Sequence, residues 1–511
     1  MRSRRRTLVA TPLAALAVLL AAAPARADDE RPRIMLEPGE VVDVADAFDG
    51  DDPYDFWFTL GFEYEAKEAR LMRETAIFEP GLTTGGFTSR QLLVGKYKEQ
   101  TSRLTPRLDF GIYHDFSFYA RLPVILNNAR RIVDTNNSAT RADTALAGAR
   151  GEQLFTLPFE APARSGIEFV ALGLDLDIFN QQRDTTKPTW LLGFETRLNA
   201  GKAMRPCTKS PKAGQVECAD AMDINRNGLF DGGHEGIEAD SSHTPGVSRG
   251  TVGLEIHTLM SKRIKYVEPY GGFNALFEFQ MGDNLYGATD LEGAIVNHPP
   301  IMGGVTLGMM IHPWEDRENF GRLTFNVRFD GQYRSEGRDY SELFDALGSS
   351  DAGSLRKPTW ARFTGCTNVN SLATCDGAET ASVIDTNSEK TYFTGLSVVE
   401  AHGRYKVSGS VSWRAAELFR LNLGLGYQFD QAHGISHDQP CNPDLNGKGV
   451  GEAGPCHSGT AQYDASGNLF GVSASGLPNP AYRPSVNAVG RRFYVDQVNT
   501  FSIFTSAAVM F

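Results

Sequence analysis

The sequence predicts an all-β protein: a transmembrane, antiparallel, up-and-down β-barrel of about twelve strands. Three observations predict this fold class. Apolar and polar side chains alternate over long segments, short and long connections alternate between those segments, and the chain ends in an alternating segment closed by Phe511. A membrane-spanning strand needs only about ten residues with every second one apolar. The mildly polar mean hydropathy of -0.29 is therefore compatible with a membrane barrel.

The first 27 residues have the pattern of a secretory signal peptide. Arginines follow Met1, residues 8–23 are apolar, and Pro24-Ala25-Arg26-Ala27 forms a small-x-small cleavage site. Beyond this site no stretch approaches the roughly 20 consecutive apolar residues of a membrane helix. We therefore expect an exported mature chain that begins at Asp28.

Residues 28–54 are acidic and show no strand pattern. Two interpretations of this periplasmic segment stay open. It is either a disordered tail, or a plug that folds inward and meets arginines of the lumen.

Alternation marks the strands within residues 55–511. The clearest case runs from Val399 to Trp413, where Glu400, His402 and Arg404 begin a polar face opposite an apolar one. A barrel with lipid outside and water inside requires such strands. The predicted strands are 55–74, 91–113, 116–126, 166–178, 189–199, 250–261, 266–280, 300–312, 321–335, 395–413, 418–430 and 493–511.

The connections supply an independent indication. Long ones alternate with short ones, such as those around His114-Asp115 and Pro313-Trp314-Glu315-Asp316. This asymmetry predicts short periplasmic turns, long extracellular loops and two periplasmic termini, in the outer membrane of a Gram-negative envelope. The long loops are 127–165, 200–249, 281–299, 336–394 and 431–492.

The last strand indicates a partner. Phe501, Ile503, Val509 and Phe511 lie on one face of a strand that ends with the chain. We interpret this pattern as the sorting signal that barrels present to the insertion machinery of the outer membrane, whose lipid the finished barrel contacts. The net charge of -12 argues against nucleic acid as a partner.

The six cysteines form three close pairs, all within predicted outer loops. In an exported protein, close pairs of this kind are typical of disulfides that close small loops. The pairs are Cys207 with Cys218, Cys366 with Cys375, and Cys441 with Cys456.

One loop motif has the ligand spacing of a calcium site. Residues 223–231 read D-x-N-x-N-G-x-x-D, which places oxygen atoms at alternate positions around a glycine bend. The twelfth position, where helical calcium hands carry glutamate, is His234, so Glu235 or Glu238 would have to substitute. The alternative is a plain turn cluster. The ligands of a Ca²⁺ ion that orders the 200–249 loop would be Asp223, Asn225, Asn227, the Leu229 carbonyl, Asp231 and Glu235.

Replacing Asp223 by Ala tests the calcium hypothesis. We expect more rapid proteolysis within 200–249 and unchanged barrel folding, because the substitution removes one ligand from a site that only orders the loop. The measurement is limited proteolysis with and without a chelator. Equal resistance of Asp223→Ala and wild type under both conditions would exclude calcium.

The predicted lumen face is rich in charge of both signs, so net charge should not make the pore strongly selective. Such residues either line a water-filled path or pair across the barrel and close it. They are Arg107, Asp109, Arg121, Asp175, Asp177, Glu195, Arg197, Glu255, His257, Glu278, Arg328, Asp330, His402, Arg404 and Arg420.

Several segments carry a resemblance to known proteins. They are His114-Asp115-Phe116 through Leu122-Pro123, Leu172 through Leu176, Leu307 through Glu315, and Gly490-Arg491-Arg492-Phe493. They resemble transporter-like outer-membrane β-barrels of Gram-negative bacteria, an uncharacterised group distantly similar to hydrocarbon and fatty-acid uptake channels. The resemblance implies a channel, and solutes of apolar character.

Three functions follow from these patterns. The first is a passive or weakly selective channel for small solutes. The second is a non-transporting surface barrel whose disulfide-closed loops bind partners. The third is a barrel hydrolase with Asp430, His433, His437 and Asp438 at its rim. Because no G-x-S-x-G elbow or H-E-x-x-H zinc motif is present, we do not expect an enzyme.

Overall fold

The computed structural model describes most of the chain between Gly39 and Phe511. No helix within this described part is long and apolar enough to cross a membrane. The described residues are 39–49, 52–79, 86–135, 153–208, 216–217, 245–281, 285–286, 296, 298–316, 319–350, 352, 355–358, 390–392, 394–416, 418–436, 457–463, 469–478 and 491–511.

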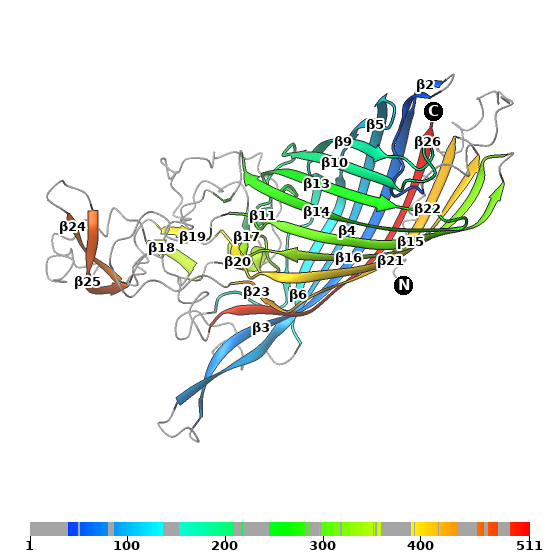
Figure 1. Cartoon of the computed structure of the whole chain (residues 1–511). Coiled ribbons are helices and arrows are strands. Elements are labelled where there is room, and N and C mark those ends of the chain that lie inside the picture. Colours follow the sequence, from blue (N-terminus) through cyan, green and yellow to red (C-terminus); the bar gives the residue numbers. More distant parts are fainter. Residues whose placement is uncertain are drawn as a thin grey trace, which may run out of the picture.

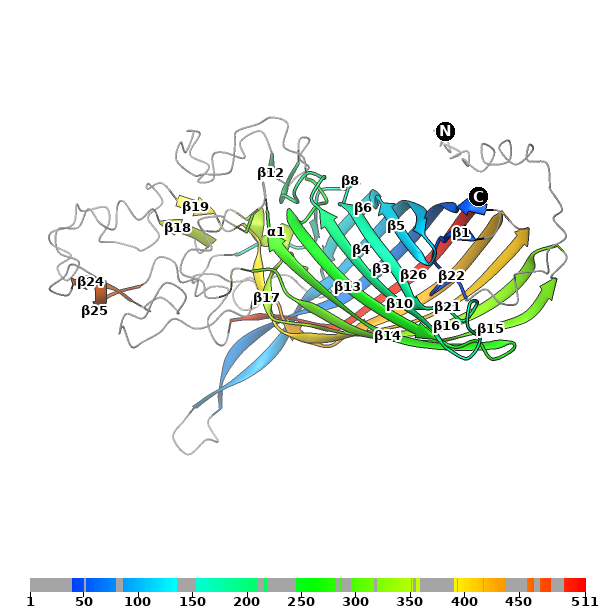
Figure 2. The same cartoon turned by 45° about the horizontal axis from the view of Figure 1, so that its top comes forward.

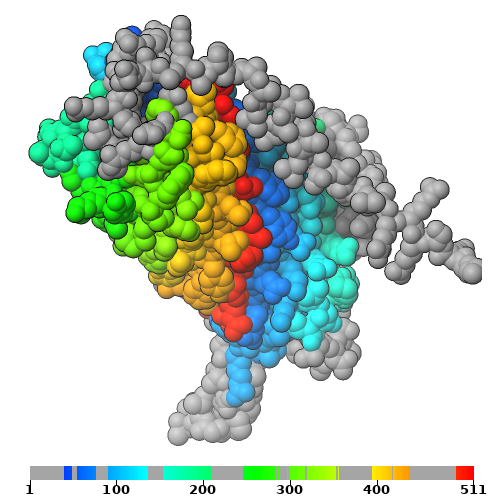
Figure 3. All heavy atoms as spheres, turned by 90° about the vertical axis from the view of Figure 1, so that its right-hand side faces the viewer, coloured from blue at the N-terminus to red at the C-terminus, as the bar shows by residue number. Residues whose placement is uncertain are grey.

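Twelve strands form one closed antiparallel barrel (Figure 1), as the sequence predicted. Each pairs with the next, and the last returns to the first, from Phe493 opposite Arg73 to Met510 opposite Trp57. Figure 3 shows this closure from outside, where red β26 runs between orange β22 and blue β3. The strands are β3 (Phe56–Glu79), β4 (Gly86–Tyr113), β5 (Phe116–Arg121), β9 (Val170–Phe179), β10 (Thr189–Leu198), β13 (Thr251–Ser261), β14 (Val267–Gln280), β15 (Met302–Asp316), β16 (Gly321–Arg334), β21 (His402–Ala416), β22 (Phe419–Asp430) and β26 (Phe493–Met510).

The outer face of the barrel is apolar. On β9, Leu172, Leu174 and Leu176 are exposed, while Asp175 and Asp177 between and beyond them are buried. Successive side chains of a strand point to opposite faces. The polar residues next to these lipid-facing leucines therefore point into the lumen. The exposed apolar rows recur on strands around the barrel and form the surface that lipid would cover.

The two ends of the barrel differ. The short connections leave one end, here named the turn end, and His114, Lys265 and Phe320 reverse the chain there with positive φ of 46°, 57° and 54°. The first and last strands meet at this end, where Phe56 and Phe511 exchange two backbone hydrogen bonds of 2.9 Å. The long connections leave the other end, named the loop end.

Two predicted strands are interrupted. The strand expected at 116–126 is split at Leu122-Pro123 into β5 and β6 (Val124–Val133), and both halves pair with β4. The strand expected at 166–178 is likewise split, into β8 (Arg164–Ile167) and β9. Pro123 has no N–H to donate, so the ladder cannot continue through it. The expected loop 127–165 is shorter than predicted, because β6 and β8 extend into it.

Two further boundaries were wrong. The turn expected at Pro313-Trp314-Glu315-Asp316 is part of β15, because Pro313 lies in a register shift of that strand, where a missing N–H is tolerated. Residues 395–401 do not begin a barrel strand. Instead, β20 (Ser397–Val399) pairs with β17 (Gly337–Asp339) in a separate small sheet.

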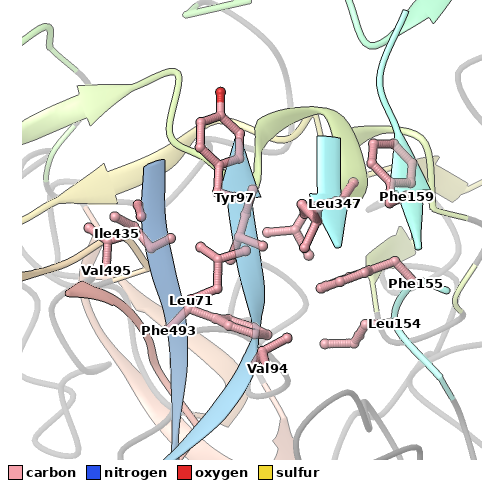
Figure 4. Packing of buried hydrophobic residues seen from close by; sticks show 14 of the residues in the cluster. Leu71, Val94, Tyr97, Leu154, Phe155, Phe159, Leu347, Ile435, Phe493 and Val495 are labelled. Carbon is pink, nitrogen blue, oxygen red and sulfur yellow. The ribbon is translucent and has the colours of Figure 1, made fainter. Parts of the chain in front are cut away.

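The loop end carries a hydrophobic core on the inward face of the strand extensions. Leu71, Val94 and Phe493 of the extended strands pack there with Phe155 and with Leu347 of α1 (Phe344–Gly348), as Figure 4 shows. Burial of these side chains holds the described loop segments against the strand extensions.

Further short elements lie at the two ends of the barrel or beyond its loop end, where Figure 2 shows β18, β19, β24 and β25. They are β1 (Ala47–Asp49), β2 (Asp52–Tyr54), β7 (Phe159–Glu160), β11 (Cys207–Thr208), β12 (Val216–Glu217), β18 (Arg356–Pro358), β19 (Lys390–Tyr392), β23 (His433–Gly434), β24 (His457–Tyr463) and β25 (Leu469–Pro478).

Candidate functional site

Two charged rows cross the lumen face of neighbouring strands. The register aligns Arg107 with Arg121, and Arg121 with Ala171, which in turn lies opposite Arg197. Three arginines therefore share one row. One step nearer the turn end, the aligned residues are Asp109, Tyr119, Gly173, Glu195 and Glu255.

Glu195 is the centre of these rows. Its carboxylate accepts hydrogen bonds from Arg121 at 2.6 Å, Arg197 at 2.7 Å and the Tyr119 hydroxyl at 3.1 Å. Arg197 also pairs with Glu255. The Glu195 side chain is only 4% exposed, so its charge depends on these donors for compensation.

A second group lies beside this centre. Arg107 Nη2 is 2.6 Å from one Asp109 oxygen and 3.3 Å from Asp175. His257 Nε2 is 3.0 Å from the other oxygen of Asp175. A Cβ atom on Gly193 would overlap the His257 ring, so the imidazole reaches Asp175 only because residue 193 has no side chain. The predicted lumen residues of these strands are thus brought together in pairs.

The predicted lumen charges on β16 and β21 form separate pairs. Arg328 lies 2.8 Å from Asp330, which also accepts a 2.6 Å hydrogen bond from Thr306. Arg404 donates from Nε to Asp430 at 3.2 Å. These residues also lie on the inward face.

The lumen wall formed by β21, β22 and β26 contains many small residues, although the Phe504 ring lies over Gly424 and Lys406 lies beside Gly426. The strand register places hydroxyl groups and glycines of these three strands next to one another. At the same levels, the opposite wall has charged side chains. Sequence reasoning missed this wall because it considered only charge, although every second residue from 408 to 412 is serine. The residues are Ser408, Ser410, Ser412, Gly424, Gly426, Ser502 and Ser506.

A cavity of about 380 Å³ lies between the barrel strands and the loop end. Its lining comes from strands on both sides of the lumen and from loop residues such as Met204 and Tyr340. Of the charged lining residues, the sequence analysis had named only Arg404. The charged residues are Glu65, Lys67, Glu99, Arg103, Arg130, Arg164, Glu168, Arg249 and Arg404.

The loop end of this cavity is closed by buried ion pairs. Asp345 of α1 accepts hydrogen bonds from Arg164, whose side chain is fully buried, and lies 3.7 Å from Arg130. Lys67 Nζ lies 2.7 Å from Glu342. Burial raises the pKa of Glu342, but Lys67 and nearby His433 outweigh burial and hold this pKa at about 2.

The described part of the acidic N-terminal segment lies inside the turn end. Arg420, on the inward face of β22, is 3.7 Å from Glu40 and 3.5 Å from Asp43. Ala47 exchanges backbone hydrogen bonds of 3.0 and 2.9 Å with His114. Residues 39–49 therefore contact the lumen wall, while residues 28–38 lie outside the described part of the chain.

The proposed rim residues of a hydrolase are only partly described. The His433 ring stacks on His402 with centroids 3.6 Å apart, and its Nδ1 donates to a backbone carbonyl at 2.7 Å. No hydrogen bond joins His433 to Asp430 among the described residues, and His437 and Asp438 lie outside them.

The predicted loop sites also fall largely outside the described residues. This holds for Asp223 and all other proposed calcium ligands, and for every cysteine except Cys207. Within the described residues, no group of three or more His, Cys, Asp or Glu side chains is arranged to hold a metal. Cys207 is disulfide-bonded, but its partner is not among the described residues, so the pairing remains a prediction.

Comparison with known proteins gives distant likenesses only. No protein-family model and no curated protein matches the chain. An outer-membrane channel from Pseudomonas putida F1 matches with 7% identity and a TM-score of 0.36 over 93% of this chain and 99% of that one. A Pseudomonas aeruginosa FadL homologue has 7% identity and a TM-score of 0.30 over 89% and 90%. The P. putida toluene transporter TodX has 8% identity and a TM-score of 0.30 over 95% of both.

The chain has the fold of an outer-membrane β-barrel. The predicted resemblance to outer-membrane channels is confirmed as distant similarity of fold. Identities and scores this low transfer no solute, so the function must be argued from the lumen itself.

Proposed function

We propose that the protein is a gated outer-membrane channel for small polar solutes. The observation that carries this proposal is the cavity of about 380 Å³ inside the barrel. Its volume falls in the range of about 300–1,000 Å³ that is usual for sites of small molecules. Because the cavity lies within a closed barrel, any solute that occupies it is on the axis of a transmembrane path.

The chemistry of the lining favours polar over apolar solutes. Nine charged side chains face the cavity, whereas Ile125, Met204 and Val247 are its main apolar contacts. An apolar solute would displace water from ionised groups without replacing its hydrogen bonds. The resemblance to hydrocarbon channels implied the opposite preference, and the charge of the lining outweighs that implication.

The small-residue wall supports passage beyond the cavity. Ser408 and Ser410 on β21 face the lumen beside Gly426 and Ser502. The hydroxyl groups can hydrogen-bond a passing polar solute without binding it tightly, as conduction requires.

The N-terminal segment is the gate in this proposal. Glu40 and Asp43 are held by Arg420, and these three side chains are only 15–17% exposed. The turn end, with both termini, would face the periplasm, and the loop end with its calcium and disulfide candidates would face outward.

Single-channel recording tests the proposed function. We expect the refolded protein in a planar bilayer to give discrete, reproducible conductance steps. Vesicles containing it should also swell in small sugars or amino acids. Correct folding is checked by the heat-dependent mobility of barrels on gels. A folded but silent protein, with and without residues 28–49, would contradict a channel.

The alternative function is a non-transporting surface barrel. The hydrophobic core at the loop end favours this function, because it fixes loop segments that a pore does not require. Its residues include Leu71, Val94, Phe155, Leu347 and Phe493. In that case vesicles would remain impermeable, and deletion of the loop segments would abolish partner binding without any effect on barrel folding.

A further inference from the structure

The charges around the cavity are nearly balanced, although its lining alone contains more cations than carboxylates. Most of the lining cations have acidic partners behind them: Lys67 has Glu342, and Arg249 has Glu278 and Asp339. A solute that carries a net charge would therefore meet a buried charge of its own sign close to any attractive one.

Most of the charged lining residues have already used their hydrogen-bonding groups. Glu99 accepts from Arg130 at 3.1 Å, Asn128 at 2.6 Å and Tyr97 at 2.9 Å. Arg164 donates to two backbone carbonyls and to Asp345. Such residues form the wall of the cavity and have little to offer a ligand.

Arg404 and Glu65 differ from these residues. Arg404 makes a single hydrogen bond, from Nε to Asp430, and its two terminal nitrogens make none in the described part of the chain. Glu65 accepts no hydrogen bond there. Its nearest cation is Arg103 at 3.6 Å, and that guanidinium donates instead to Glu63 at 3.0 Å. Both side chains line the same cavity.

The two groups stand at different levels of the lumen. The register places Glu65 opposite Ser502, which in turn lies opposite Gly426, whereas Arg404 lies opposite Asp430 at the loop end of β22. Thr500 and Gln428 line the cavity at the level between them. A ligand that reaches both charges must therefore be extended, with its own charges separated.

We propose that the cavity binds a small zwitterion, with its carboxylate on Arg404 and its ammonium group on Glu65. The terminal nitrogens of a guanidinium match the two oxygens of a carboxylate. A zwitterion compensates both groups at once and adds no net charge to a balanced cavity. A monoanion or a monocation would leave one of the two groups desolvated and without a partner. This proposal rests on the proposed function and specifies its solute class.

The experiment is isothermal titration calorimetry on the refolded mature protein in detergent near neutral pH. The probes are glycine, β-alanine, 4-aminobutyrate and 6-aminohexanoate, with butanoate and butylamine as matched compounds that lack one charge. We expect saturable binding of a longer ω-amino acid, at least about tenfold tighter than either single-charge compound, because each loses a charge-assisted hydrogen bond.

Two substitutions assign the ends of the ligand. Glu65→Gln keeps the shape of the side chain and Arg404→Lys keeps its charge toward Asp430. Each substitution should weaken binding of the zwitterion about tenfold. Glu65→Gln should change the affinity for butylamine, and Arg404→Lys the affinity for butanoate, by no more than this factor. Glu68→Gln is the control, since Glu68 is on the outward face of β3 and its side chain is 60% exposed.

Equal affinities for zwitterions and single-charge compounds, or unchanged affinity in both variants, would overturn the inference. Absence of binding by every probe would also overturn it. Conductance steps in the same preparation would then leave the channel proposal standing, whereas a silent bilayer would remove both.

Discussion

Gly111→Ala is expected to raise the single-channel conductance severalfold. Gly111 faces the lumen from β4, and a Cβ atom there would overlap the backbone carbonyl oxygen of Asp46. Because backbone cannot rotate away as a side chain can, the N-terminal segment must move. The smallest possible side chain should therefore expel this segment from the turn end and open the path.

The segment is held by hydrogen bonds and ion pairs to the lumen wall, and its Val42, Ala45 and Ala47 side chains are buried. Gly39 N donates to Glu268 at 3.1 Å, and Asp55 N donates to the Asp46 carbonyl at 3.2 Å. Other links include the two hydrogen bonds between Ala47 and His114, the ion pairs of Arg420, and the 4.0 Å ion pair of Arg183 with Asp46. None of these belongs to the barrel ladder, so the barrel should fold as in the wild type.

Gly61→Ala is the matched control. Gly61 also faces the lumen, on neighbouring β3, but its nearest neighbour for an added Cβ would be the Thr105 carbonyl oxygen at 3.5 Å, an ordinary contact. Its conductance should equal that of the wild type. Deletion of residues 28–49 should reproduce the effect of Gly111→Ala. If Gly111→Ala leaves conductance unchanged while the deletion raises it, the steric argument is wrong.

Glu195→Gln is expected to destabilise the barrel by about 3–5 kcal/mol, the usual cost of removing one partner from a buried ion pair. Glu195 compensates Arg121 and Arg197 together and accepts the Tyr119 hydroxyl. The glutamine amide group keeps only one acceptor oxygen and has no charge. Its NH2 group would lie against guanidinium N–H groups where the second carboxylate oxygen now accepts.

Urea unfolding in lipid vesicles, followed by tryptophan fluorescence, measures this loss. Glu68→Gln is the control, because Glu68 pairs with Lys98 at 2.7 Å on the exposed face and should contribute about 0–1 kcal/mol. Equal unfolding midpoints for Glu195→Gln and Glu68→Gln would show that lumen water screens the Glu195 charge.

The strand pattern was accessible from the sequence because it is a local property. The alternation of Leu172, Leu174 and Leu176 predicts the outward face of one strand without any information about the adjacent strands. In two places where a local rule failed, a single residue was responsible. Pro123 splits a strand that alternation alone would continue, and Pro313 sits inside a strand where composition suggested a turn.

The candidate site was only partly accessible. The inward positions of Arg107, Glu195 and Arg404 follow from alternation, so the sequence could name them. It could not predict that Arg121 and Arg197 share Glu195, because that depends on the register of three strands. It also missed Glu65 and Lys67, which lie on the polar face of the first strand but have no motif around them.

The sequence by itself thus determined the barrel and its strand number, since a period of two is carried by each strand alone. The tertiary structure decided which inward charges compensate one another, where the cavity remains, and that Glu40 and Asp43 contact the lumen arginine Arg420. These features depend on side chains that lie far apart in the sequence and meet across the lumen. The pairing of neighbouring strands and the closure of β26 against β3 together set those distances.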